Sequence, residues 1–578
     1  MQIERSRTLL KYRCEYCNIE TKTSDCPVCK ERTKCTSEMY WCKKCNIPTY
    51  LDSCPICGQH TTYIATDLRP VFPEERLLIE IALGKPFEYE KNSVWNGAGN
   101  IYYVDGKRIN FSIKDLPKLD VEHIKNQYYQ LASQNKYDYF NKTIKKWVSA
   151  NNDRFNEITS EAYSYIRKIT EGYDVEDMFV SFSGGKDSTV TSDLVMNALG
   201  TAKVLHIFGD TTLEFPETLE YVNRFKNAHN MTPVISSKNK EKNFEDLCRV
   251  VGPPSRVMRW CCTIFKTGAI TKKISVLFGD KNHILTFYGI RRSESSSRSK
   301  YDRESDSPKI AKQTVIAPII DWYDYDVWLY LLTAGIDFNS AYRLGYARVG
   351  CWCCPNNSIW SEFLSKIHMS EQYYAFRELL VEFAKQIGKP DSEEYIDSGN
   401  WKARQGGNGL DIANRSIVSF TPCATEENAF NYELQRPITE ELYELFKPFG
   451  YLNSELGNAR LGEVYIQNKT GVLLLKLQGR IGSSHLKVTI LNNKIARAKS
   501  LKTAEEKVKC QLTKYQMCMG CMACTSVCKH DAISIKENEH GNIEYQISEN
   551  KCLHCGECVG HFNAGCYMRK VLAIKRGI

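Results

Sequence analysis

The chain has 578 residues and a formal net charge of +9, with 42% hydrophobic and 25% charged residues. This composition supports several folded domains and excludes a chain that is disordered throughout. The mild basicity is compatible with an anionic substrate or with RNA and requires neither. No stretch has the length and apolar character of a membrane span, and the opening Met1-Gln-Ile-Glu-Arg lacks the pattern of a secretory signal, so we expect a cytoplasmic protein.

Cysteine is the unusual component, because the chain holds 25 and most of them lie near its two ends. In a reducing compartment, CxxC pairs serve as metal ligands or redox groups rather than as disulfides. Near the start, the pattern CxxC, eight residues, CxxC occurs twice. Four thiolates hold zinc tetrahedrally, so we predict two zinc ribbons in a domain 1–66, with an iron site of rubredoxin or [4Fe–4S] type as the alternative. The ligands are Cys14, Cys17, Cys26 and Cys29, and then Cys42, Cys45, Cys54 and Cys57.

The segment 67–154 follows as a linker domain. Residues 94–113 alternate in polarity around Asp105-Gly106, which predicts a β-hairpin, and the residues from 121 onward are typical of helices.

A phosphate-binding turn is predicted next. The apolar strand 179–183 runs into two glycines and then into an amphipathic helix that extends to 199. Such a turn presents backbone N–H groups to an anion, and its spacing differs from that of the nucleoside-triphosphatase P-loop. The turn consists of Ser183, Gly184, Gly185, Lys186, Asp187, Ser188 and Thr189.

This SGGKDS turn resembles the PP-loop of the ATP pyrophosphatase and phosphoadenylylsulfate (PAPS) reductase superfamily. Residues 210–218 are similar to the family's second nucleotide segment, 287–298 to its arginine-bearing loop, and 317–328 to its P-I-x-x-W-x-x-x-D-V-W stretch. The resemblance covers a domain 155–365 and implies an α/β fold with a doubly wound, mainly parallel sheet of the adenine nucleotide α-hydrolase type. It assigns nucleotide binding to the turn with Asp210, Glu214 and Gly289, and contacts with sulfate or phosphate to Lys186, Arg291, Arg292 and Arg298.

Cysteines in this domain resemble those of iron–sulfur adenylylsulfate reductases, which carry a Cys-Cys pair and a later G-C-x-x-C. The resemblance implies a third [4Fe–4S] cluster, with a zinc site or buried thiols as alternatives. The implied ligands are Cys261, Cys262, Cys351 and Cys354. Two features depart from the reductases: the PP-loop is intact, as in the ATP-using members, and the E-C-G-L-H tail with its nucleophilic cysteine is absent.

The C-terminal part is predicted as a helical extension 366–455, a small β domain 456–510 and an electron-carrying domain 511–578. The last of these resembles a bacterial two-cluster ferredoxin, in which the fourth cysteine of each run ligates the other cluster. This rule gives Cys518, Cys521, Cys524 and Cys566 for one [4Fe–4S] cluster, and Cys552, Cys555, Cys558 and Cys528 for the other. Five cysteines remain without a role: Cys35, Cys248, Cys353, Cys423 and Cys510.

The combination predicts an enzyme that reduces PAPS or adenylylsulfate to sulfite with electrons from its own ferredoxin domain, which an external low-potential donor would fill. One alternative is an ATP-dependent, adenylating sulfur transferase that acts on RNA or DNA, with the zinc ribbons and positive charge serving the nucleic acid. The other is a nucleotide-binding redox sensor that docks a protein partner through its ribbons.

Overall fold

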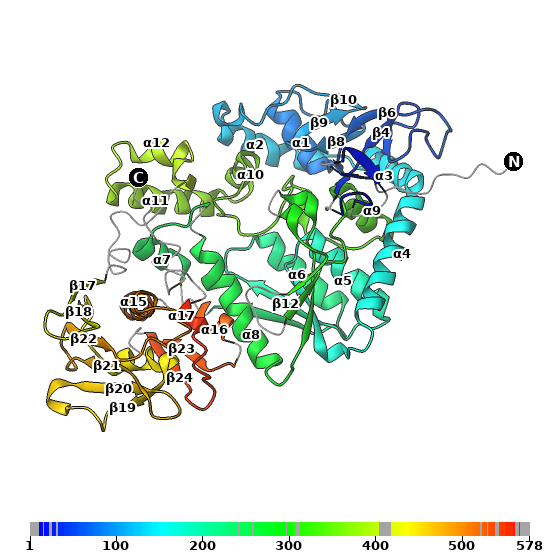
Figure 1. Ribbon diagram of the computed structural model, residues 1–578. Helices are drawn as coiled ribbons and strands as arrows, with labels where there is room; N and C mark the ends of the chain where they lie inside the picture. Colours follow the sequence, from blue (N-terminus) through cyan, green and yellow to red (C-terminus); the bar gives the residue numbers. More distant parts are fainter. Residues whose placement is uncertain are drawn as a thin grey trace.

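The computed structural model describes residues 11–14, 17–21, 26–30, 33–239, 243–256, 259–295, 298–306, 313–403, 418–518, 520, 523–528, 530–537, 543–560 and 566. Figure 1 shows an N-terminal part above a central α/β part, and a C-terminal β-rich part beside them. Cys521, a predicted ferredoxin ligand, lies outside the described residues. None of the helices in these ranges combines the length and apolar character that a membrane span needs.

A six-stranded sheet forms the central part, in the order β13-β12-β11-β14-β16-β15. All its pairings are parallel except that of β15, which lies antiparallel at one edge. The strands are β11 (Met178–Phe182), β12 (Leu205–Asp210), β13 (Val234–Lys238), β14 (Ile284–Tyr288), β15 (Glu304–Asp306) and β16 (Gln313–Ile316). The predicted doubly wound α/β fold is confirmed, and the chain order reverses between β11 and β14, where such sheets bind ligands.

Helices cover both faces of this sheet because its buried strands are apolar on both sides. On one face, Phe179 and Ile207 pack against Ile270 and Ile274 of α8. On the other face, Val180 shares a buried cluster with helices α4, α5 and α9. The helices of this part are α4 (Asn152–Ile169), α5 (Lys186–Leu199), α6 (Pro216–Ala228), α7 (Phe244–Val251), α8 (Ala269–Leu277) and α9 (Asp324–Ala334), with the π-helix η4 (Cys262–Gly268) before α8.

The two cysteine quartets near the N-terminus each sit on a three-stranded antiparallel sheet. The first sheet holds β1 (Lys11–Cys14), β2 (Ile19–Thr21) and β3 (Lys34–Thr36), and the second holds β4 (Met39–Cys42), β5 (Ile47–Thr49) and β6 (Thr62–Ala65). Met39, Trp41 and Ile47 of the second unit are buried in the same cluster as Leu194 of α5 and Trp328 of α9. The second unit therefore shares a core with the central sheet.

A buried carboxylate joins this second unit to the central part. Asp326 of α9 accepts hydrogen bonds from Arg154 of α4 (Nε, 2.9 Å; Nη2, 3.0 Å) and from the Tyr50 hydroxyl (2.8 Å). Both side chains of the ion pair are almost fully buried. Removing one partner of such a pair leaves the other charge uncompensated in a medium of low dielectric constant.

The predicted hairpin of the linker segment is confirmed. Strands β7 (Leu68–Pro70), β8 (Val94–Gly97), β9 (Ile101–Val104) and β10 (Lys107–Arg108) form a sheet in the order β10-β9-β8-β7. The turn between β9 and β10 has positive φ at Asp105 (49°) and Gly106 (77°), which matches the type I′ turns favoured in hairpins. The adjoining helices are α1 (Pro73–Ala82), α2 (Val121–Leu131) and α3 (Asp138–Ala150).

The segment 366–455 differs from the predicted helical extension. It is helical through α10 (Ile359–His368), α11 (Ser370–Gln386) and α12 (Ser392–Asp397), and then it supplies strands of a six-stranded antiparallel sheet. The strands are β17 (Ser419–Pro422), β18 (Ala429–Glu433), β19 (Tyr451–Asn453), β20 (Glu463–Gln467), β21 (Leu473–Gln478) and β22 (His485–Ile490). The pairing of β18 is with the distant β22 (Ala429 opposite Thr489), which no local sequence pattern reveals.

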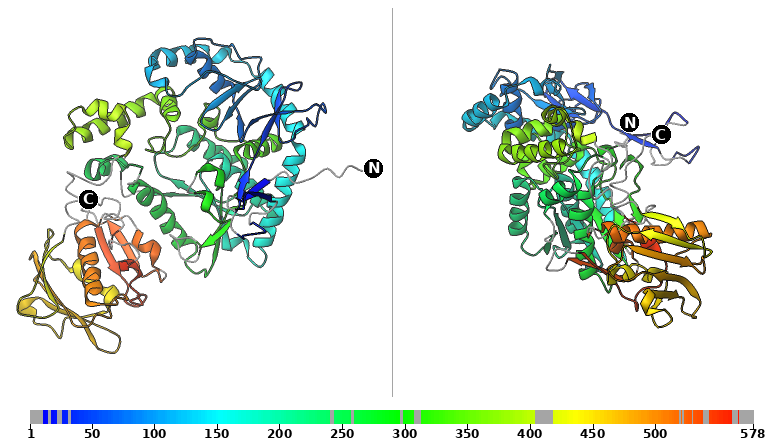
Figure 2. Two further views of the ribbon diagram at one scale, coloured as in Figure 1. Left: turned by 45° about the horizontal axis from the view of Figure 1, so that its top comes forward. Right: turned by 90° about the vertical axis from the view of Figure 1, so that its left-hand side faces the viewer.

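The ferredoxin-like end packs on this antiparallel sheet through one buried cluster that includes Leu477, Val488, Ile533 and Tyr545. Figure 2 shows both sheets in the same C-terminal lobe. Its remaining elements are α14 (Glu440–Glu444), α15 (Leu501–Met517), α16 (Ala523–Val527), α17 (Glu557–Gly560), β23 (Ile533–Glu537) and β24 (Ile543–Ile547).

A change at the buried Asp326 tests how firmly the second cysteine unit is joined to the core. We expect Asp326→Asn to reduce the free energy of unfolding by about 3–5 kcal/mol, because the guanidinium of Arg154 stays buried without its counter-charge. The matched control is Asp337→Asn, since the Arg224–Asp337 pair is exposed and should cost less than about 1 kcal/mol. Urea unfolding followed by tryptophan fluorescence measures both, and equal losses would contradict the assignment.

Candidate functional site

The turn after β11 holds the start of helix α5 at the switch point of the sheet. Gly184 has a φ of +69°, a conformation that favours glycine, and a Cβ there would lie 2.9 Å from Thr218 Cγ2. The Ser188 hydroxyl accepts a hydrogen bond from the Ser183 amide (3.2 Å) and donates one to the Gly185 carbonyl (2.9 Å). The turn is thus closed by its own side chains.

The loop after β14 crosses the same turn at close range. A Cβ at Gly289 would lie 2.5 Å from the carbonyl carbon of Asp187 and 2.6 Å from its oxygen. No side chain fits between the two segments, so glycine is required here for a steric reason. The predicted residues of the phosphate turn and Gly289 are therefore brought together.

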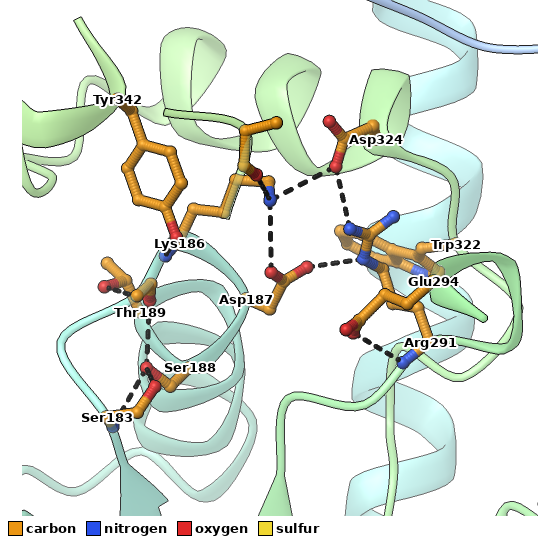
Figure 3. Close-up of polar contacts among 12 residues, drawn as sticks. Ser183, Lys186, Asp187, Ser188, Thr189, Arg291, Glu294, Trp322, Asp324 and Tyr342 are labelled. Carbon is orange, nitrogen blue, oxygen red and sulfur yellow. Dashed lines mark hydrogen bonds and ion pairs between the residues drawn. The ribbon is translucent and has the colours of Figure 1, made fainter. Parts of the chain in front are cut away.

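Four charged side chains form a network beside the turn, as Figure 3 shows. The Lys186 ammonium lies 3.3 Å from Asp187 and 3.2 Å from Asp324. Arg291 contacts the same two carboxylates, at 2.5 Å from Asp187 and 2.7 Å from Asp324. Although burial favours a protonated carboxyl, Arg291 and Lys186 lower the pKa of Asp187 to about 2. Lys186 and Arg291, which we predicted to contact an anion, are therefore already paired with two carboxylates in this structure.

Asp67, just before β7, holds Asp324 in position. Its carboxylate accepts hydrogen bonds from the backbone amides of Asp324 (3.0 Å) and Tyr325 (3.1 Å), at the start of α9. Burial and the neighbouring Asp324 carboxylate raise the pKa of Asp67 to about 7, against the opposing effect of Arg291. A residue from the linker segment thus completes the charge network.

The other two predicted arginines follow Arg291 along the chain after β14 and have other partners. Arg292 pairs with Asp321 and donates to the Tyr301 carbonyl (3.0 Å), while Arg298 pairs with Glu294. Both are only partly exposed. Each is therefore already held by a carboxylate and takes no part in the four-residue network.

The second nucleotide segment joins the switch point to the middle cysteines. The Glu214 carboxylate accepts hydrogen bonds from the Thr211 amide (3.0 and 3.1 Å) and hydroxyl (2.6 Å), and burial raises the pKa of Glu214. The Leu213 carbonyl accepts from the Trp352 amide (3.0 Å), and Thr211 Oγ1 lies 3.5 Å from the sulfur of Cys351. Asp210 caps the same loop by accepting from the Thr212 amide at 2.9 Å.

The cysteines of the central α/β part, Cys261, Cys262, Cys351 and Cys353, lie close enough to influence one another's pKa. Contact with Cys262, burial, and the thiols of Cys351 and Cys353 raise the pKa of Cys261 well above its usual value. Burial raises the pKa of Cys351 to about 12. Within the described ranges, however, the only quartets whose ligand atoms all lie within 4.8 Å of one another are the two near the N-terminus, so the third cluster stays a prediction.

The N-terminal quartets are assembled as the sequence predicts. The four sulfurs of each lie within 4.8 Å of one another, which confirms two sites of four cysteines each. Thiolates at this spacing suit zinc or iron, and zinc stays a prediction.

The C-terminal cysteines of the two runs lie near one another. One small cavity is lined by all four of Cys528, Cys552, Cys555 and Cys558. Burial, and then the neighbouring thiols of Cys566 and Cys524, raise the pKa of Cys518 to about 12. Cys528 thus lies beside the second run and Cys518 near Cys566. The crossed ligand sets stay a prediction, and an all-thiolate donor set suits [4Fe–4S] clusters.

A buried apolar junction connects the C-terminal lobe to the middle cysteines. Helix α16 packs against the π-helix that begins at Cys262. The junction cluster contains Met517 and Cys566 from the C-terminal lobe, together with Trp260, Ile264 and Cys353, and Cys261 and Cys351 pack against it.

Four residues of the site were not predicted from the sequence. Tyr342 accepts from the Lys186 amide (3.0 Å), and Asn339 donates to the Gly184 carbonyl (3.1 Å). Asp324 lies inside the stretch 317–328, which was recognised from its sequence motif although Asp324 itself was not singled out. Asp67 lies far away in sequence, and no motif marks it.

Comparisons with known proteins agree with this arrangement. Residues 177–357 match the phosphoadenosine phosphosulfate reductase domain, and residues 517–561 match the 4Fe-4S dicluster domain. The adenosine 5′-phosphosulfate reductase of Neisseria meningitidis serogroup B is 31% identical over 180 residues, which are 29% of this chain and 68% of that protein. An uncharacterized protein of Methanocaldococcus jannaschii is 30% identical over 261 residues, 45% of this chain and 60% of its own length.

A second uncharacterized protein of the same archaeon is 30% identical over 266 residues, 46% of this chain. The matched region thus spans only 60% and 54% of the two archaeal relatives. Among solved structures, a phosphoadenylyl-sulfate reductase from Candida auris in complex with phosphate aligns at 16% identity with a TM-score of 0.27, over 34% of this chain and 94% of that chain.

A methyl group at Gly289 tests the close contact between the β14 loop and the phosphate turn. We expect Gly289→Ala to force the loop away from Asp187 and to lower the free energy of unfolding by about 1–3 kcal/mol, because the added methyl group overpacks two backbone segments. Gly350→Ala is the control, since a Cβ there meets nothing within 4 Å. Urea unfolding measures both, and an unchanged free energy of unfolding in Gly289→Ala would contradict the geometry.

The raised pKa of Asp67 predicts a pH dependence of stability. The folded state holds the Asp67 proton up to about pH 7, whereas the unfolded chain releases it near its usual value of 3.8. Stability from this group is therefore complete below the unfolded-state value of 3.8 and is lost as the pH rises to about 7. We expect the melting temperature of wild type, relative to Asp67→Asn, to fall from about pH 4 to pH 7 and to level off above, and a difference that is constant with pH would contradict the assignment.

Proposed function

The chain belongs to the phosphoadenosine phosphosulfate reductase domain family, and on that premise we propose that it reduces a sulfonucleotide with electrons from its own dicluster domain. The substrate is adenosine 5′-phosphosulfate or its 3′-phosphorylated form. The bond between the sulfur and the oxygen that bridges it to phosphate breaks, the oxygen stays on the nucleotide, and the sulfur takes up two electrons and leaves as sulfite.

The observation that carries the proposal is the buried junction between the two lobes. Cys566 of the dicluster domain and Cys353 of the reductase domain belong to one apolar cluster, against which Cys261 and Cys351 pack. Cys351 in turn touches Thr211 of the second nucleotide segment. A chain of contacts thus runs from the electron-carrying domain to the edge of the nucleotide site. Such a route has no purpose in an enzyme that only hydrolyses or transfers nucleotides.

The residues of the switch point bind and orient the nucleotide in this proposal. The N-terminus of α5 and the Ser183 hydroxyl receive phosphate oxygens, as helix N-termini do. The Lys186 amide and the buried Thr189 hydroxyl are already bound to Tyr342 and Tyr221, and they hold the turn in shape. Lys186 and Arg291 share their charge between the incoming anion and the carboxylates of Asp187 and Asp324. Because those carboxylates already hold both cations in fixed positions, little reorganisation is needed when the substrate enters.

Iron–sulfur clusters, when bound, supply one-electron transfer in this scheme. Their proposed ligands are the two crossed C-terminal sets and, in the reductase domain, Cys261, Cys262, Cys351 and Cys354. The apolar surroundings of the junction exclude water from the route between the lobes.

Two of the five unassigned cysteines, Cys353 and Cys423, support a route without a covalent thiol intermediate. Burial raises the pKa of Cys353 well above its usual range, and a protonated, buried thiol is a poor nucleophile. The Thr425 hydroxyl lowers the pKa of Cys423, but that residue lies next to strand β17 in the C-terminal lobe. Electrons from the dicluster domain take the place of the missing nucleophilic tail.

The activity test is an anaerobic assay with dithionite-reduced protein and each sulfonucleotide separately. We expect release of sulfite and of AMP, or of its 3′-phosphorylated form, in equal amounts. Release of pyrophosphate from ATP in the presence of RNA, without sulfite from either sulfonucleotide, would instead establish the adenylating sulfur transferase. Absence of turnover with all three nucleotides would leave the redox sensor as the surviving alternative.

Iron content tests the proposed third cluster. We expect Cys261→Ser to lower bound iron by about one third and to remove sulfite formation, because a [4Fe–4S] cluster needs four thiolates. Cys423→Ser, which changes a cysteine outside every proposed ligand set, should keep both iron and activity. Iron analysis and visible absorbance of anaerobically purified protein give the measurement. Full iron content in Cys261→Ser would refute this cluster while leaving the C-terminal pair unaffected.

A further inference from the structure

A lysine is buried among the cysteines of the dicluster domain. Lys514 lies on α15, the long helix that precedes the first cysteine run, and only 1% of its surface is exposed. Its ammonium donates a hydrogen bond to the backbone carbonyl of Cys558 (3.0 Å) and lies 5.6 Å from the centre of the Tyr545 ring. In the part of the chain that the structure describes, it forms no ion pair with a carboxylate. A buried ammonium without a counter-charge is costly, so its partners have to be sought elsewhere.

Lys514 lies between residues of both predicted ligand sets. Its backbone carbonyl accepts a hydrogen bond from the Cys518 amide (2.9 Å), while its ammonium reaches the Cys558 carbonyl. Cys518 belongs to one proposed set and Cys558 to the other, and both pack in one buried cluster. The lysine is therefore shared between the two sites, where the ligand thiolates of bound clusters would supply the negative charge that the buried ammonium needs.

A second buried donor faces the same cysteines from strand β24. Tyr545 is 1% exposed, and its hydroxyl makes no hydrogen bond within the described residues. Tyr545 belongs to the same buried cluster as Cys524 and Cys558, one cysteine from each proposed ligand set. Buried polar groups in folded proteins nearly always have a partner, and sulfur atoms of a bound cluster would supply one here.

We propose that Lys514, assisted by the hydroxyl of Tyr545, is a shared electrostatic element that raises the reduction potentials of both C-terminal [4Fe–4S] clusters. Each cluster takes up one electron from the external donor and so gains a negative charge. A fixed cation and an O–H donor beside the ligand sulfurs stabilise that added charge, and both are recognised means by which a protein raises a cluster potential. The proposal rests on the dicluster domain and holds whichever nucleotide the reductase domain accepts.

Lys514 is held in place by a helix that lies between the antiparallel sheet and the dicluster domain. Lys514 belongs to α15, and that helix contacts both β22 of the antiparallel sheet and α17 of the dicluster domain. The antiparallel sheet therefore supports α15, the helix that places the Lys514 ammonium beside the cysteines of the dicluster domain. Because the same ammonium faces both ligand sets, one substitution should shift both clusters in the same direction.

The test is a spectroelectrochemical titration of the full chain, purified anaerobically, with the reduced clusters followed by electron paramagnetic resonance. We expect Lys514→Met to lower the midpoint potentials of both C-terminal clusters by about 59 mV or more, which is a tenfold change in a one-electron equilibrium constant. Lys514→Arg should keep them near the wild-type values, and Tyr545→Phe should lower them by a smaller amount. Lys502→Met is the control, since Lys502 is an exposed residue of the same helix.

The outcomes distinguish this proposal from the proposed enzyme activity. Unchanged potentials in both Lys514→Met and Tyr545→Phe, with full iron content, would overturn it, as would an equal shift in Lys502→Met. Should Lys514→Met fail to retain iron, the Tyr545→Phe potentials decide alone. Sulfite formation takes no part in the measurement, so a protein without reductase activity would still give a decisive result.

Discussion

The arrangement of this protein depends on a close meeting of two loops at the switch point of a parallel sheet. Gly289 leaves room for the turn after β11, and Lys186 and Arg291 share Asp187 and Asp324 across the gap. Buried charges of this kind are tolerated only when every one of them is matched. This pairing of charges requires a fixed position for α9, the helix that carries Asp324. Residues of the N-terminal part hold that helix in place.

The N-terminal part therefore affects the site indirectly, through hydrogen bonds to helix α9. Asp67 caps the first amides of α9, and Tyr50 of the second cysteine unit donates to Asp326 on the same helix. Metal binding by that unit, whose small sheet has a core in common with α5 and α9, contributes to the stability of the helix that presents Asp324. A structural role for the second cysteine unit, in which it stabilises helix α9, accounts for these contacts without a bound nucleic acid.

Much of this could be predicted from sequence because the relevant signals are local. The SGGKDS turn, the repeated CxxC pairs and the ferredoxin spacing each lie within a short window whose chemistry is specific. The helical prediction for 366–455 was wrong at β17, β18 and β19, because a strand such as β18 is defined by its pairing with the distant β22. Asp67 and Lys514 were missed for a related reason: an isolated acid or base has no pattern until the fold brings its partners together.

The central claim is that electrons pass from the C-terminal clusters to a sulfonucleotide through the buried junction. Stopped-flow mixing of stoichiometrically reduced protein with adenosine 5′-phosphosulfate or its 3′-phosphorylated form, with no donor present, tests it directly. The account predicts that the iron–sulfur absorbance returns to the oxidised level in a single turnover, with one sulfite formed for every two electrons lost. Clusters that stay reduced in the presence of both sulfonucleotides would contradict it.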